Sequence, residues 1–263
     1  MAEMLTISLL LGLISGFLAG LFGIGGGLVI VPGLAIVFKH YQFPEHTLMI
    51  MAIATSLATI NLTALASIRA HHRLGSMLWG RVLHLLPGIV LGAGFGAWLA
   101  HNLDDRWLRI SFIVFLCHAG LKLLKHAETP PVTGKPTWWV DWMAAWLIGT
   151  LSAIIGIGGG TMTVPYLVRC GHSILNAIAV SSACGLPIAM VATLSYSILG
   201  WRLTELPPYS FGYIYLPACA GISMASLMTA PLGAKLAHKL PAKRLKRYFA
   251  LLLFAIAAKM AFP

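Results

Sequence analysis

Long apolar stretches separated by short polar loops make up almost the whole chain. Most of these stretches contain no charged residue and are long enough to cross a bilayer, whereas two shorter ones reach that length only if flanking Lys and Arg side chains extend to the membrane surface. The stretches run over 4–38, 46–68, 82–103, 142–168, 170–201 and 206–234, with the shorter ones at 110–121 and 248–258. This pattern predicts an all-α polytopic membrane protein with about eight hydrophobic segments.

The composition excludes a water-soluble domain and leaves little room outside the membrane. Hydrophobic residues make up 59% of the 263 positions and charged residues only 10%, and the mean hydropathy is +0.86. The four cysteines stand singly in apolar stretches, which is typical of reduced core residues rather than of a disulfide or metal framework. The chain is therefore expected to be a multi-span membrane protein, with the first segment retained as a span.

The excess of positive charge is explained by membrane orientation. Lys and Arg number 18 against 7 Asp and Glu, giving a net charge of +11. Cytoplasmic loops of membrane proteins carry such an excess, so we expect no nucleic-acid partner. The basic loops at 69–81, 122–135 and 235–247 are accordingly placed in the cytoplasm, and both termini outside.

A glycine cluster occurs twice, each time in the middle of an apolar stretch. The sequence Gly-Ile-Gly-Gly-Gly stands at Gly23–Gly27 and again at Gly156–Gly160, and Val-Pro follows each copy. Glycine costs roughly 1 kcal/mol and proline roughly 3 kcal/mol inside a helix, so a regular helix is expected to break at both clusters. A break inside a bilayer is tolerated only where protein covers it or where it faces a water-filled cavity. The alternative is that these glycines serve close helix packing alone.

The second half of the chain repeats the first. Ala54–Ser56 is matched by Val180–Ser182, and Leu99–His101 by Leu236–His238. The predicted division is a first repeat over 1–125, a proline-rich linker over 126–137 and a second repeat over 138–263.

The loop charges predict that the two repeats are inverted. Each repeat then has about four hydrophobic segments and opens with a helical hairpin folded back at the glycines, one from each side of the membrane. Inverted repeats with broken helices at mid-membrane are a common transporter plan. Lys39 and Arg169 fit this scheme poorly, because it puts these two cations on opposite sides of the membrane. One of them then lies outside, where positive charge is disfavoured.

The breaks are candidate anion sites. The second half-helices are predicted to begin at Leu28 and Thr161, and a helix N-terminus carries roughly half a positive charge together with unpaired N–H donors. Two such ends facing each other would hold an anion without a basic side chain. The glycines would let the backbone approach the ligand and adopt a positive φ at the tips. They are Gly25, Gly26, Gly27, Gly158, Gly159 and Gly160.

Hydroxyl and amide side chains near the breaks are the next candidates. They can donate to an oxyanion without the desolvation cost of a buried Lys or Arg. The substrate-binding candidates are Thr55, Ser56, Asn61, Thr161, Ser181 and Ser182. The competing interpretation is that such groups bond to their own backbone or join neighbouring helices.

Two histidines could carry a coupling proton. His84 and His118 are ionisable and lie within or near apolar segments, although a neutral histidine bonded across helices is the competing interpretation. Gly88, Gly92 and Gly96 lie on one helix face at a spacing that predicts close helix packing. No dinucleotide fingerprint, Walker lysine or HExxH motif is present, so we expect neither an enzyme, a cofactor nor a metal.

The repeated motifs together resemble those of the TauE/SafE family, which is described as sulfite and organosulfonate exporters. The resemblance rests on the doubled glycine motif with its Val-Pro, on Ala54–Leu57, on Val180–Ala183 and on the closing stretch Leu236–Phe254. It covers essentially the whole chain. It implies an inner-membrane secondary transporter for a small sulfur oxyanion or sulfonate such as sulfite or sulfoacetate, driven by an ion gradient.

Several alternatives stay open on the sequence. The direction could be import, the substrate could be a carboxylate, or the chain could be a membrane assembly subunit that transports nothing. The expected partners are a small anion, the lipid bilayer and a coupling proton or sodium ion; a homodimer is left open.

Overall fold

The structure is a bundle of helices with one short strand pair. The computed structural model describes residues 2–22, 26–124, 137–237 and 242–261. The helices of the first half are α1 (Ala2–Phe22), α2 (Gly27–His40), α3 (Leu48–Arg73), α4 (Trp79–His101) and α5 (Asp105–Leu124). Those of the second half are α6 (Trp138–Ile155), α7 (Gly160–Arg169), α8 (Ile174–Gly200), α9 (Leu216–Ala237) and α10 (Ala242–Ala261).

The predicted all-α polytopic membrane protein is confirmed. Among the described residues α3, α4, α6 and α8 are long and apolar enough to cross a membrane, and shorter apolar helices accompany them. Their outer faces carry exposed Leu, Ile and Trp side chains, as expected of surfaces in contact with lipid. The proline-rich linker lies outside the described residues except for Thr137, which precedes α6.

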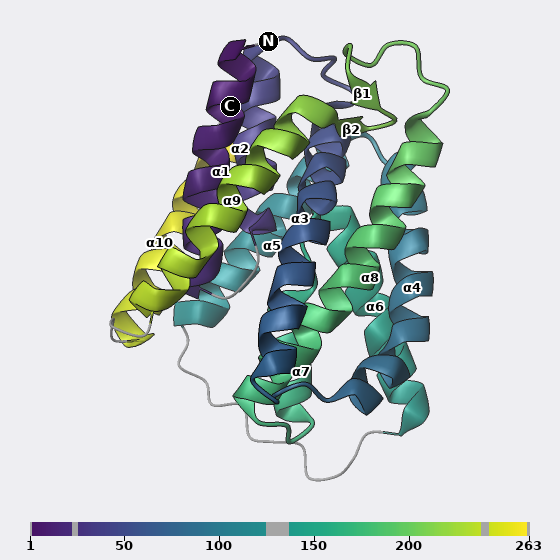
Figure 1. Cartoon of the computed structure of the whole chain (residues 1–263). Helices are drawn as coiled ribbons and strands as arrows, with labels where there is room; N and C mark the ends of the chain where they lie inside the picture. Colours follow the sequence, from purple (N-terminus) through teal and green to yellow (C-terminus); the bar gives the residue numbers. More distant parts are fainter. Residues whose placement is uncertain (1, 23–25, 125–136, 238–241, 262–263) are drawn as a thin grey trace.

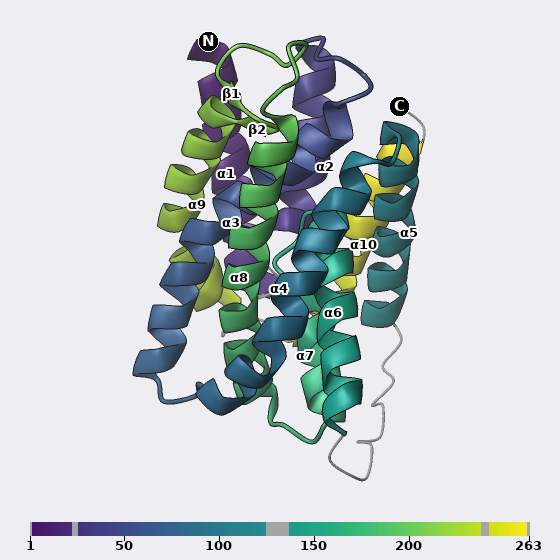
Figure 2. The ribbon, with the colours of Figure 1, turned by 90° about the vertical axis from the view of Figure 1, so that its right-hand side faces the viewer.

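Both glycine clusters interrupt a helix, as predicted. α1 and α2 are separated at the first cluster, and α6 and α7 at the second. α1 begins and α2 ends at the end of the bundle where the N-terminus lies, whereas α6 begins and α7 ends at the opposite end (Figures 1 and 2). The second half-helices begin one residue earlier than predicted, at Gly27 and Gly160.

The two breaks meet inside the bundle. A Cβ atom on Gly27 would lie 2.4 Å from the carbonyl oxygen of Gly156 and 2.9 Å from the Ile157 side chain. That approach leaves no room for a side chain at Gly27. The backbone of one break is therefore covered by the backbone of the other.

Positive φ values occur at two glycines of the second break but not at Gly26 of the first. Gly156 caps the end of α6 with φ +81°, and Gly159 caps the start of α7 with φ +74°. Gly26 instead has φ −68°, a helical value open to any residue. The backbone conformation at Gly26 therefore does not require glycine. A small residue is needed at this position only because the space around it is limited.

Close packing joins the first helix of each half to a helix of the other half. α1 lies along α9, and α6 lies along α4. Gly12 and Gly16 of α1 press against the backbone of α9. On α4, Cβ atoms at Gly92 and Gly96 would lie 2.1 Å and 2.4 Å from carbonyl oxygens of α6. The packing role predicted for the glycine ladder of α4 is confirmed.

The centre of the bundle is formed by α3 and α8, which also contact each other. Every residue from Leu48 to Leu57 is buried. A short antiparallel hairpin is formed by β1 (Ser210–Phe211) and β2 (Ile214–Tyr215). It covers the first residues of α3, at the end of the bundle where the N-terminus of the chain lies (Figure 1). The sequence analysis assigned these residues to an apolar segment, but a left-handed turn at Gly212 (φ +56°) joins two short strands before α9 begins.

Candidate functional site

A central cavity of about 480 Å³ lies where the two breaks meet. Gly26 of the first break and Gly158 and Gly160 of the second line its wall. The remaining wall comes from α1, α2, α3, α7, α8 and α9, so both halves of the chain contribute. The cavity extends from the breaks to His71 near the end of α3. We refer to it below as the central cavity.

The described wall of the central cavity is mainly apolar, with several hydroxyl groups and no fixed charge. Apolar side chains such as Ile30, Ile60 and Leu227 alternate with hydroxyl groups, and His71 is the single ionisable side chain of the described lining. The hydroxyl groups belong to Ser15, Thr63, Ser67, Ser181, Ser182 and Ser226. Such a lining can donate hydrogen bonds to an anion and still release it, because no buried Lys or Arg has to be separated from it.

Most of the lining hydroxyls already have a partner. Ser67 donates to the Ser182 hydroxyl over 3.0 Å, and Ser182 donates to the Ile178 carbonyl oxygen over 3.0 Å. Thr63 bonds to the carbonyl oxygen of Ile60 over 3.1 Å. Ser181 is 3% exposed, and no hydrogen bond to it is found within the described part of the chain. Its hydroxyl is therefore the one most ready to bind a ligand.

The N-terminal ends of two helices adjoin the central cavity. The N–H groups of Val29 and Ile30 bond to the Gly26 carbonyl oxygen, and those of Met162 and Thr163 bond to that of Gly159. The earlier N–H groups of each helix have no acceptor within their own helix. These donors and the positive ends of α2 and α7 lie beside the cavity wall at Gly26 and Gly160.

The structure brings part of the predicted site into the central cavity. Gly26, Gly158, Gly160, Ser181 and Ser182 line it. Gly27 is pressed against Gly156 instead, and Gly159 faces the side chain of Ile188. Gly25 lies outside the described residues.

The first pair of predicted hydroxyls is fully buried and is used elsewhere. Thr55 accepts the N–H of Tyr215 over 3.0 Å, which ties β2 to α3. Ser56 donates to the carbonyl oxygen of Gly156 over 2.9 Å. Neither residue lines the central cavity, so the two halves place their matching hydroxyl pairs differently.

Asn61 and Thr161 lie near the central cavity without lining it. Asn61 donates from Nδ2 to the Thr193 hydroxyl over 3.0 Å and so joins α3 to α8. Its Oδ1 atom and the Thr161 hydroxyl are buried with no hydrogen-bond partner among the described residues. A small shift of either side chain could therefore bring an unpaired polar atom to a ligand.

The two candidate histidines lie apart from the central cavity and differ in their surroundings. His84 Nε2 lies 3.3 Å from Oδ2 of Asp141. His118 is exposed on α5, and no hydrogen bond to it is found among the described residues. Of the two, only His84 belongs to a polar cluster.

A buried ionic cluster was missed by the sequence analysis. Asp141 of α6 is 2% exposed and takes two hydrogen bonds of 2.6 Å from the Arg81 guanidinium of α4. The Tyr166 hydroxyl of α7 also donates to it. The cluster therefore ties α7, which carries cavity wall, to α4 and α6. The available signal was an acidic residue next to an apolar segment, which is rarely left without a partner.

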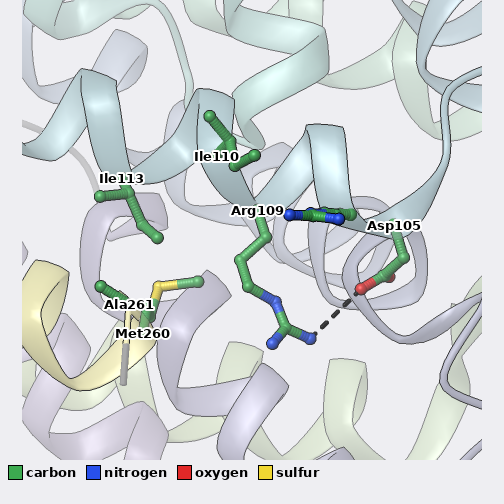
Figure 3. A pocket seen from close by; sticks show the side chains of 7 residues that line it. Asp105, Arg109, Ile110, Ile113, Met260 and Ala261 are labelled. Atoms are coloured by element: carbon green, nitrogen blue, oxygen red, sulfur yellow. Dashed lines mark hydrogen bonds and ion pairs between the residues drawn. The ribbon is translucent and has the colours of Figure 1, made fainter. Parts of the chain in front are cut away.

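A second pocket of about 500 Å³ lies between α5 and α10 and involves none of the predicted residues. Figure 3 shows Ile110, Ile113 and Met260 along it, with Arg109 pointing toward Asp105. The Arg109 Nη2 atom lies 3.4 Å from Asp105 Oδ2. Because it touches neither break, this pocket is not the candidate site.

Comparisons with known proteins agree on one family. The sequence profile of the family described as "Sulfite exporter TauE/SafE" matches residues 8–260. A probable membrane transporter protein of Haemophilus influenzae is 39% identical over 99% of both chains. One of Methanocaldococcus jannaschii is 25% identical over 92% of this chain and 90% of its own.

A more distant relative is named more specifically, as an inner membrane transporter. The probable inner membrane transporter protein TsaS of Comamonas testosteroni is 24% identical over 67% of this chain and 70% of its own. No solved structure matches the chain significantly.

Proposed function

The chain belongs to the TauE/SafE family of membrane transporters, and from this premise we propose that it carries a small sulfur oxyanion or organosulfonate, such as sulfite or sulfoacetate, across the cytoplasmic membrane. The proposed direction is export. The substrate is proposed to bind in the central cavity, in contact with both breaks.

One observation carries the proposal: the central cavity joins the two breaks and has no Lys, Arg, Asp or Glu in its described lining. A sulfonate or sulfite needs several donors around its oxygens. The N-terminal ends of α2 and α7 and the free hydroxyl of Ser181 offer them from both halves. Because helix ends attract an anion with only roughly half a unit charge each, the site can also release it.

We further propose that the chain is built from two inverted repeats that rock about the central cavity. The helix pairs support this proposal, because α1 packs along α9 and α6 packs along α4. If α1 corresponds to α6 and α4 to α9, the first helix of each half packs against the equivalent helix of the other half. The opposite entry of the two broken segments agrees with this correspondence (Figures 1 and 2). Inverted repeats around a mid-membrane site are an established route to alternating access.

The alternatives concern direction, substrate and class. Import of the same anions uses the same cavity, and a carboxylate presents a similar charge to the helix ends. In a non-transporting assembly subunit the glycines would serve packing alone, as they do on α4. The hydroxyl lining at the breaks favours a transporter, because packing alone has no use for an unpaired Ser181.

A flux assay in proteoliposomes tests the proposal. The purified protein is reconstituted, the vesicles are loaded with labelled sulfite, sulfoacetate or acetate, and loss of label is followed. We expect protein-dependent movement of sulfite or sulfoacetate that exceeds movement of acetate, and slower movement in Ser181→Ala. Acetate moving faster than both would replace the substrate class. No protein-dependent flux of any of them would refute transport of these anions.

A further inference from the structure

The central cavity extends from the breaks toward one end of the bundle. Its described lining on α3 runs from Ile60 to His71, in the second half of that helix, and on α8 from Ile178 to Gly185, in the first half. Both parts lie at the end of the bundle opposite the N-terminus (Figures 1 and 2). The basic loop over 69–81 lies at this end, so in the predicted orientation the cavity opens to the cytoplasm.

The hairpin of β1 and β2 closes the other end. Thr55 of α3 accepts the N–H of Tyr215 over 3.0 Å. The Tyr213 N–H donates to the carbonyl oxygen of Tyr196 on α8 over 3.3 Å, and the Tyr213 hydroxyl lies 2.9 Å from Nδ1 of His101 on α4. Tyr213 and Tyr215 are both buried. The hairpin is therefore fastened to three helices at the end where the cavity is closed.

A loop at the open end corresponds to this hairpin. The sequence match between the ends of α4 and α9, carried back along both helices without a gap, pairs Leu78 with Tyr215. Leu78 directly precedes α4, and Tyr215 directly precedes α9. The loop over 74–78 lies beside the mouth of the cavity, because Ser76 donates to the carbonyl oxygen of His71 over 3.2 Å.

The hydrogen bond that fastens the closed end has no counterpart at the open end. Thr55 is matched by Ser181 in the second repeat. Thr55 accepts the N–H of Tyr215, whereas the cavity-lining Ser181 hydroxyl has no hydrogen bond with any described residue. The Leu78 N–H likewise has no acceptor within the described part of the chain. The donor and the acceptor of the corresponding bond are therefore both present and both unused.

We propose that the Ser181 hydroxyl accepts the N–H of Leu78 when the cavity closes at the cytoplasmic end, while Thr55 releases the N–H of Tyr215 as the outer end opens. This exchange rests on the proposed function and on the inverted repeats. One hydrogen bond replaces another of the same kind, so the exchange itself costs little. A hydroxyl can accept this N–H and still donate to a bound anion, which lets the loop close over an occupied cavity.

Crosslinking of paired cysteines tests the exchange without any substrate. In a cysteine-free protein, Leu78→Cys is combined with Ser181→Cys, and Thr55→Cys with Tyr215→Cys. Each pair spans the two halves, so a short thiol-to-thiol reagent should keep the halves joined on a denaturing gel after a protease site placed in the linker is cut. The matched control combines Leu78→Cys with Ser182→Cys, because the neighbouring Ser182 hydroxyl already donates to its own helix.

Both test pairs should crosslink, because the resting protein exchanges between the two states. We expect the Leu78 and Ser181 pair to react more slowly than the Thr55 and Tyr215 pair by about 10-fold or more, since a minor state is typically populated at about 10% or less. The control pair with Ser182 should stay uncrosslinked over the same time, because its side chain points to another part of the α8 surface. A Leu78 and Ser181 pair that reacts no faster than the control would overturn the exchange.

If the cysteine pairs fail to fold, spin labels at two exposed positions decide instead. Leu74 of the loop and Leu175 near the start of α8 are 76% and 66% exposed, so labels attached there leave the core intact. We expect two populations of distance between them, one for the open mouth and one for the closed mouth, and a single population overturns the exchange. Crosslinking of Leu78 with Ser181 in a protein that moves neither sulfite nor sulfoacetate would refute the proposed substrate and leave the exchange standing.

Discussion

The Ser56 hydroxyl donates to the carbonyl oxygen of Gly156 over 2.9 Å, and so joins the central helix of one half to the break of the other. Ser56 is fully buried, and a buried carbonyl at a helix break has no water to bond with. This hydroxyl therefore satisfies a group that the break exposes. It holds the second break in place from outside its own repeat.

Removing that bond should cost stability. Ser56→Ala leaves the Gly156 carbonyl oxygen unpaired in an apolar setting, which costs about 1 to 3 kcal/mol. We expect a clear fall in Tm in detergent. The control is Ser8→Ala, whose buried hydroxyl bonds to Met4 within its own helix over 2.7 Å and whose loss should change Tm less. Equal shifts in the two variants would show that the bond across the halves has no special role.

Ser181 and Thr55 should respond differently to loss of their hydroxyls. Ser181→Ala should weaken sulfoacetate binding by about ten-fold or more, because a hydrogen bond to a charged ligand is worth about 1.5 to 3 kcal/mol. Thr55→Ala should lower Tm and leave affinity unchanged, because Thr55 holds the N–H of Tyr215. Binding titrations of both variants check this. Weaker sulfoacetate binding in Thr55→Ala but not in Ser181→Ala would place the substrate site at Thr55 of α3 instead.

Alanine substitutions at Gly26 and Gly159, one glycine from each break, should also have different effects. A methyl group on Gly26 enters the cavity wall, where it meets the end of the Ile30 side chain at 2.9 Å and the Ala19 Cβ atom at 3.9 Å, with no strained φ. Gly26→Ala should therefore keep its fold and lose transport per folded molecule.

Gly159→Ala should lose stability first. Its φ is +74°, and its new methyl group would lie 2.6 Å from the Ile188 side chain. Tm and flux are measured on the same reconstituted samples. Normal flux per folded molecule in Gly26→Ala would separate the first break from the substrate site.

Neutralising Asp141 should destabilise the bundle strongly. Asp141→Asn leaves the Arg81 guanidinium without its charge partner, and breaking a buried pair costs about 3 to 5 kcal/mol. The Arg81 side chain is 17% exposed, so we expect the lower end of that range. Arg81→Met with Asp141→Leu removes both charges and should recover part of the Tm. A double variant no more stable than Asp141→Asn would contradict the pairing.

Labelling from outside the cell tests the predicted orientation. In a cysteine-free background, single cysteines at Leu74, between α3 and α4, and at Leu203, beyond the end of α8, are exposed in the structure. The basic loop that contains Leu74 is predicted to be cytoplasmic, so a membrane-impermeant maleimide should label position 203 in intact cells and position 74 only after lysis. Labelling of both positions in intact cells would reject the inverted scheme.

The breaks were predictable from sequence because they follow from backbone chemistry alone. Consecutive glycines weaken a helix wherever they stand, and both breaks lie at the glycine clusters. The cavity wall on α3 was also within reach. Ile60, Thr63, Ser67 and His71 recur three or four residues apart, which places them on one helix face.

Other parts of the site could not be predicted, because they depend on which helices become neighbours. Thr55 and Ser56 are adjacent in sequence, yet one bonds to β2 and the other to the second break. Arg81 and Asp141 come from helices on either side of the linker. Periodicity gives the face on which a side chain lies, and the partner across that face is fixed only by tertiary packing.

The pairing of α1 with α9 has a consequence for biosynthesis. α1 leaves the ribosome before α9 and all the helices between them, but its small-residue face at Gly12 and Gly16 fits α9. α6, by contrast, finds its partner α4 already in the membrane. In the nascent chain α1 therefore stays without this packing partner until α9 is inserted. Ribosome-bound chains that stop before α9 should keep α1 open to crosslinking with lipid, and full-length chains should lose that crosslink.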